Sequence, residues 1–130
     1  MDILCYISNI NREVDMQTLQ DKLFDLEMDY FDTYGKGCGF KTRWSLFDKG
    51  IKFGELSEFA PGTVITNRCG VWGYDTEAVV GGRGTWGDVW LACDSVIRNA
   101  RDDEGNPDHH VFIEGFERNK DGTWNVVTGS

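Results

Sequence analysis

The spacing of apolar residues predicts an amphipathic helix in the first third of the chain. Large apolar side chains recur three and four positions apart, which places them on one face of a helix. The residues of this face are Met16, Leu19, Leu23, Leu26 and Tyr30, and Phe24 and Phe31 widen it. Asp15 is suited to cap the N-terminus, and Gly35, Gly37 and Gly39 disfavour a longer helix. The pattern predicts a helix over about residues 15–33.

A second helix is predicted where a glycine-rich segment meets a run of apolar residues. Thr85, followed three positions later by Asp88, has the arrangement of a capping box. The apolar residues that follow share one helix face and are Val89, Trp90, Cys93, Val96, Ile97 and Ala100. Arg98 and Arg101 suit the negative end of the helix dipole. We expect this helix over about residues 86–101.

The other segments alternate apolar and polar residues in the manner of strands. Residues 3–7 form a short apolar run, and residues 40–66 contain two or three alternating stretches. Residues 111–116 and 123–128 flank an Asn-Lys-Asp-Gly turn, which predicts a C-terminal β-hairpin. The order of elements predicts a single α+β domain over residues 1–130, with a mainly antiparallel sheet and two helices on one of its faces.

Composition and the first residues indicate a folded cytoplasmic protein. Apolar residues make up 40% of the chain and charged residues 27%, which is typical of a globular domain. The N-terminus lacks the basic start and long apolar run of a secretory signal. The cysteines are dispersed at Cys5, Cys38, Cys69 and Cys93, so we expect reduced thiols, with two disulfides or a dispersed metal site as alternatives.

The formal net charge of −9 restricts the kind of partner. Nucleic acids and anionic membranes attract basic surfaces, so direct binding to either is disfavoured. A basic protein partner fits this charge better. Solubility alone is the alternative explanation of the acidic composition.

Four aspartates lie at helical spacing along the first predicted helix. Like charges four positions apart repel by a few tenths of a kcal/mol, and acids near the helix C-terminus oppose its dipole. Because these residues work against helix stability, we predict that they bind a basic partner. Tyr30 or Tyr34 would act as the anchor, and a later acidic loop would enlarge the surface. The predicted residues are Asp21, Asp25, Asp29, Asp32, Tyr30, Asp102, Asp103 and Glu104. A solvated acidic face and a homodimer remain open.

Carboxylates one helical turn apart, about 5.4 Å along the axis, have a spacing comparable to that of phosphates along a nucleic-acid strand. Phage anti-restriction and anti-CRISPR proteins use acidic mimicry of this kind, and this chain resembles them in size and charge. The leading hypothesis is therefore an acidic inhibitor of a nucleic-acid-binding protein, without catalytic residues, cofactor or metal.

The glycine-rich segment before the second helix is the alternative site. Backbone N–H groups at a helix N-terminus hold phosphate well, and Arg83 adds positive charge. Residues 83–87 resemble part of the pyrophosphate loop of GNAT acetyltransferases, with Trp86 in place of the middle glycine, which implies a phosphorylated ligand such as an acyl-CoA. The residues of this site are Gly82, Arg83, Gly84, Thr85 and Gly87. The alternative hypothesis is therefore a small-molecule-binding protein or transferase that holds a phosphorylated ligand at this loop. A turn into a capped helix explains the same residues.

Asp108, His109 and His110 carry side chains that bind metals or transfer protons. Adjacent residues of a strand point to opposite faces, so only one of the two histidines is expected at any one centre. We therefore predict a solvent-exposed pair and no metal site.

Overall fold

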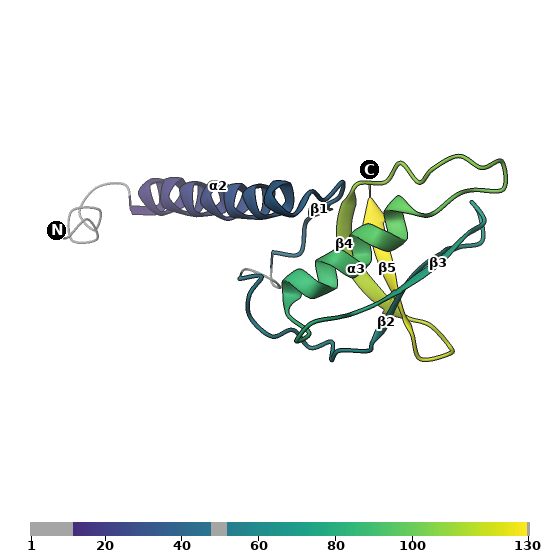
Figure 1. The fold of residues 1–130 in the computed structure, drawn as a ribbon. Coiled ribbons are helices and arrows are strands. Elements are labelled where there is room, and N and C mark those ends of the chain that lie inside the picture. The colour runs from purple at the N-terminus through teal and green to yellow at the C-terminus, as the bar shows by residue number, and fades with distance from the viewer. Residues whose placement is uncertain (1–11, 48–51, 130) are drawn as a thin grey trace.

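The computed structural model describes residues 12–47 and 52–129, with side chains from residue 18 onward. Figure 1 shows its helices and strands. In chain order they are α2 (Arg12–Cys38), β1 (Arg43–Trp44), β2 (Val64–Cys69), β3 (Tyr74–Val79), α3 (Trp86–Arg98), β4 (Phe112–Arg118) and β5 (Trp124–Gly129). The strand predicted at residues 3–7 lies outside the described residues.

The sheet has the order β1-β4-β5-β2-β3. Its antiparallel pairs are β2 with β3 and β4 with β5, whereas β1 pairs with β4 and β2 with β5 in parallel. The α+β class is confirmed, but the prediction of a mainly antiparallel sheet is wrong, because the sheet is mixed. The chain passes through α3 between β3 and β4, and such a crossover connection allows β5 to lie parallel to β2.

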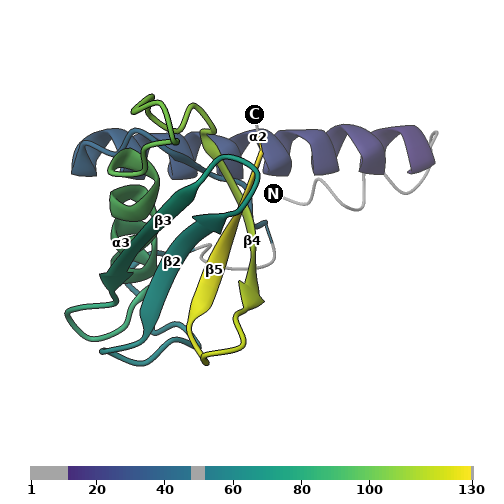
Figure 2. The ribbon, with the colours of Figure 1, turned by 90° about the vertical axis from the view of Figure 1, so that its right-hand side faces the viewer.

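Helix α3 packs its apolar side over β2 and β3 (Figures 1 and 2). Its buried apolar residues are Val89, Trp90, Ala92, Cys93, Val96 and Ile97. They form one core with residues of the sheet, among them Ile65, Ile113 and Val126. The helix begins at Trp86 as predicted and ends at Arg98, before the predicted residue 101. Arg101 instead forms a bridge with Pro107, so the chain has already turned.

The C-terminal half of α2 packs on this core through aromatic residues. Phe31 is completely buried, and the Tyr34 ring stacks on Phe53 with the ring centroids 4.5 Å apart. The helix continues beyond the predicted residue 33, through Gly35, because this glycine faces the Trp90 ring. A Cβ on Gly35 would lie 2.7 Å from that ring, so the close approach of the two helices requires a residue without a side chain.

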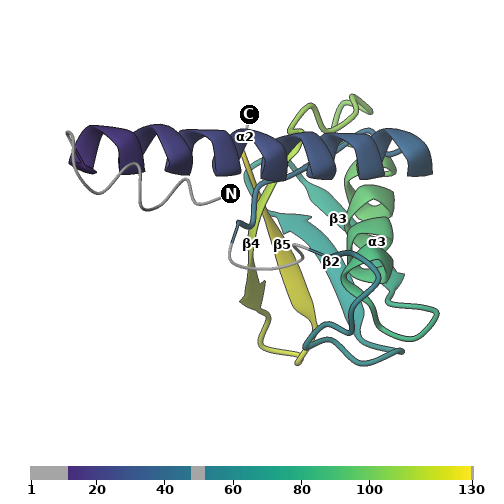
Figure 3. The same ribbon diagram turned by 90° about the vertical axis from the view of Figure 1, so that its left-hand side faces the viewer.

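The N-terminal half of α2 extends past the strands (Figures 2 and 3). The expectation that both helices cover the sheet therefore holds for α3 and not for this half of α2. None of the helices in the described residues is long and apolar enough to cross a membrane.

Candidate functional site

The segment of α2 from residue 18 to residue 30, in which no described side chain is buried, carries most of the predicted acidic face. Asp21, Asp25 and Asp29 are exposed, and their spacing of four residues places them along one side of the helix. Asp32 is half-buried where the helix meets the body, in a hollow that Lys36 and Lys41 also line. Three of the four aspartates therefore belong to this exposed segment, and the fourth lies among basic residues.

Much of the predicted apolar face of α2 is exposed on the same segment of the helix. The exposed fraction is 57% for Leu23, 65% for Leu26 and 41% for Tyr30. These side chains border a groove of about 760 Å³. The groove is lined by Gln20, Leu23, Phe24, Leu26, Glu27, Tyr30 and Lys52. An apolar groove thus lies on the helix that also carries the acidic face.

Two aromatic residues of α2 are held by the body at the end of this groove. The Tyr30 ring stacks on Phe53, with centroids 5.5 Å apart, and its hydroxyl accepts a hydrogen bond of 3.2 Å from the Phe53 N–H. The Phe24 ring lies 5.2 Å from that of Phe47. Tyr30, the predicted anchor, is therefore held in one orientation while part of its surface stays exposed.

The structure does not bring the second predicted acidic segment to α2. The loop between α3 and β4 lies at the opposite end of the molecule from the extended half of α2 (Figure 1). Within that loop the Asp102 carboxylate accepts hydrogen bonds of 2.9 Å from the N–H groups of Glu104 and Asn106. The bond from Asn106 contributes most to the lowered pKa of Asp102. Asp102 thus shapes its own loop, and Asp103 and Glu104 are exposed beside it.

The glycine-rich segment forms the predicted capping box at the start of α3. The Asp88 carboxylate accepts hydrogen bonds from the N–H groups of Arg83 at 3.2 Å and Thr85 at 3.0 Å. In return, the Asp88 N–H donates to the Thr85 hydroxyl at 3.1 Å. Burial by itself would raise the pKa of Asp88, but the hydrogen bonds to Thr85 and Arg83 lower it overall.

The other N–H groups of this segment also have partners within the chain. Gly84 donates to the Gly81 carbonyl, Trp86 to that of Glu55 and Gly87 to that of Phe53. Every backbone N–H from residue 83 to residue 88 therefore has an acceptor. Because the Asp88 carboxylate already sits at the helix N-terminus, where a phosphate would bind, the geometry favours a capped turn over a ligand site.

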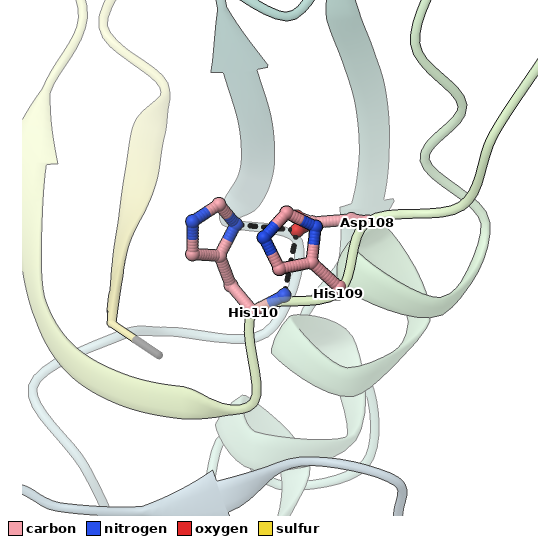
Figure 4. A group of neighbouring side chains, drawn as sticks. All are labelled: Asp108, His109 and His110. Carbon is pink, nitrogen blue, oxygen red and sulfur yellow. Dashed lines mark hydrogen bonds and ion pairs between the residues drawn. The ribbon is translucent and has the colours of Figure 1, made fainter.

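Asp108, His109 and His110 form a compact polar cluster, which Figure 4 shows. They precede β4, so the strand alternation that we expected to separate the histidines does not apply. The two imidazole rings stack instead, with centroids 4.6 Å apart. Asp108 is 1% exposed, and its Oδ1 lies 2.6 Å from the His110 Nδ1. The strand geometry behind the expectation that only one histidine can join a given centre is therefore absent.

Residues distant in the sequence complete the surroundings of this cluster. The Asn67 amide, 41 positions before Asp108, donates a 2.8 Å hydrogen bond to the Asp108 Oδ2. A pocket of about 200 Å³ lies beside His110 and is lined by Asn67, Cys69, Trp72, Tyr74, Asp108, His110 and Thr128. Burial, followed by the negative charges of Asp108 and Asp102, raises the pKa of Tyr74. Sequence reasoning missed Asn67, Trp72 and Tyr74, because they belong to β2, β3 and the turn between them.

The described cysteines, Cys38, Cys69 and Cys93, are free thiols. Cys93 lies in the core, where burial strongly raises its pKa and makes a structural role the simplest explanation.

Comparisons with models of protein families, with characterised proteins and with solved structures found no match to this chain.

Proposed function

We propose that this chain is a small acidic interaction protein that binds a basic protein partner through α2. The partner is of the nucleic-acid-binding kind, and binding blocks it, as acidic phage anti-defence proteins do. The interaction takes place in the cytoplasm.

One observation carries the proposal. Residues 18–30 of α2 expose Leu23 and Leu26 on one side of the helix and Asp21, Asp25 and Asp29 on another. Exposed groups of large apolar side chains commonly mark interaction sites, because exposing them to water is unfavourable. The two features lie on a single helix, so one partner surface can contact both.

The acidic and apolar sides have different roles in this proposal. The aspartates attract a basic surface and orient it, which mainly affects the association rate. The leucines and the fixed ring of Tyr30 are the side chains that a partner would bury, and such central anchors supply most of the affinity of an interface. Affinity should therefore fall as salt screens the charges, while a salt-resistant part remains.

A pull-down from host lysate at low and moderate salt tests the proposal. The wild type is compared with a variant in which Asp21, Asp25, Asp29 and Asp32 are replaced by Asn, and with a Leu23→Ala/Leu26→Ala variant. Asp103→Asn/Glu104→Gln is the matched control, because it also removes exposed carboxylates but lies away from α2. We expect one basic protein that both α2 variants lose and the control retains. Equal capture by all four proteins would overturn the proposal.

A second copy of the chain is the other molecule that would fit the groove on α2, so a further experiment must distinguish it from a basic partner. Leu19, Leu23, Leu26 and Tyr30 are spaced four, three and four positions apart, as in a helix–helix seam. Analytical ultracentrifugation of the purified protein distinguishes the two cases. The proposal predicts a monomer. A dimer that becomes monomeric in Leu23→Ala/Leu26→Ala would assign the groove to self-association and contradict its role in binding a partner.

A further inference from the structure

We propose that Asp108, His109 and His110 bind a divalent transition-metal ion, for which Zn²⁺ is the representative. Each of the three residues offers one ligand atom, and these atoms all lie within 4.8 Å of one another. Bonds from Zn²⁺ to nitrogen or oxygen are about 2.0–2.2 Å, so two ligands of one ion lie at most roughly 4 Å apart. Small rotations of the side chains are enough to bring the three atoms onto one ion.

The donor set selects the class of ion. Two imidazole nitrogens and one carboxylate oxygen suit Zn²⁺ and other first-row transition ions. Ca²⁺ and Mg²⁺ prefer sites made of oxygen atoms alone. Binding would break the 2.6 Å hydrogen bond between the Asp108 Oδ1 and the His110 Nδ1. The two atoms would move apart to about 3.4 Å, the separation of two ligands of one tetrahedral ion.

The surroundings hold one of the three ligands, the Asp108 carboxylate, in advance. The Asp108 Oδ1 accepts the His110 backbone N–H at 2.9 Å, and its Oδ2 accepts the Asn67 amide at 2.8 Å. Such supporting hydrogen bonds fix the orientation of metal ligands. His109 is exposed, so its ring can adjust, and the Trp72 ring lies edge-on to both imidazoles, 5.9 Å from His109 and 6.5 Å from His110.

The site combines a buried ligand with an exposed one. Asp108 is almost completely buried, whereas His109 faces solvent. An ion can therefore enter from the His109 side without opening the core. The pocket of about 200 Å³ beside His110 gives room for water or a small ligand in the remaining coordination positions.

Isothermal titration of the purified full chain with Zn²⁺ tests the proposal. We expect one saturable site with no comparable binding of Mg²⁺ or Ca²⁺. His109→Ala should weaken Zn²⁺ binding at least about tenfold, and His110→Ala likewise. His109 carries the test, because it is exposed and its replacement leaves the core unchanged. Circular dichroism of each variant checks the fold.

Two controls distinguish this site from other zinc-binding groups. Asp103→Asn/Glu104→Gln removes exposed carboxylates in the neighbouring loop, and Cys69→Ser removes the thiol of the adjacent pocket. Both should bind Zn²⁺ as the wild type does. Wild-type affinity in His109→Ala, or loss of binding in Cys69→Ser, would overturn the proposal, as would the absence of Zn²⁺ binding by the wild type.

Discussion

Helices α2 and α3 both carry a face of large apolar residues, but the body of the protein buries these faces to different extents. In α3, the side chains of Trp90, Val96 and Ile97 lie in the core, and the helix packs against β2 and β3. In α2, Phe31 is buried, while Leu23 and Leu26 a few turns earlier are mostly exposed. Periodic apolar residues therefore predict a helix with two different sides, and a neighbouring layer must be present before the apolar side becomes core.

This difference separates stability from binding within one small protein. Residues of α3 and of the C-terminal half of α2 contribute to folding, because they leave water when the chain folds. Leu23 and Leu26 gain little from folding, because both stay mostly exposed, and in the proposed function a partner would bury them. Four predictions, which use six substitutions, test this division, from the largest expected effect to the smallest.

Trp90→Ala should destabilise the protein most, by about 3–5 kcal/mol, as removal of a buried aromatic side chain usually does. Trp90 is 1% exposed, and its indole N–H donates a 3.0 Å hydrogen bond to the Thr42 hydroxyl. Urea unfolding followed by circular dichroism measures the change. A loss below about 1 kcal/mol would show that α3 does not organise the core.

Gly35→Ala and Gly37→Ala should have opposite effects, although they lie two positions apart in α2. A Cβ on Gly35 would lie 2.7 Å from the Trp90 ring, which predicts a loss of about 1–3 kcal/mol from overpacking. No atom lies within 4 Å of a Cβ on Gly37, so alanine there should stabilise the helix by up to about 1 kcal/mol. Thermal unfolding of both variants shows whether each substitution raises or lowers the stability of the protein. Equal shifts would mean that α2 does not approach Trp90 closely.

Asp88→Ala should destabilise the protein by about 1 kcal/mol at neutral pH, because it removes half of the capping box of α3. The pKa of Asp88 is lowered in the folded state, so its ionic contribution is present above the unfolded pKa of aspartate and is lost as the pH falls through the folded pKa. Urea unfolding at several pH values measures the free energy of unfolding of both proteins. The difference between Asp88→Ala and the wild type should become smaller at acidic pH. A difference in the free energy of unfolding that stays the same at every pH would indicate that the charge of Asp88 does not contribute to stability.

Leu23→Ala and Leu26→Ala should change the free energy of unfolding least, by no more than about 0.5 kcal/mol each, as surface substitutions usually do. The same replacement in a core costs about 2–5 kcal/mol. Urea unfolding of the single variants gives the comparison with Trp90→Ala. A core-sized loss would place these leucines in an intramolecular contact and remove the main support for the proposed binding face.

Local features of this protein were predictable from the sequence, because the groups that form them lie within a few residues of one another. The capping box joins Thr85 and Asp88, three positions apart, and the start of α3 at Trp86 follows from it. The existence of a helix around Leu19 to Phe31 follows from spacing alone. The four aspartates lie on one side of α2 for the same reason.

Tertiary structure decided everything that depends on which distant segments become neighbours. It extended α2 through Gly35, because the Trp90 ring packs there, and it placed β5 beside β2 in parallel. It filled the helix N-terminus with Asp88 rather than leaving it for a phosphate. It stacked His109 on His110 beside a carboxylate that Asn67 holds. Periodicity specifies which side of an element is apolar, whereas long-range packing determines whether that side meets a core, a ligand or water.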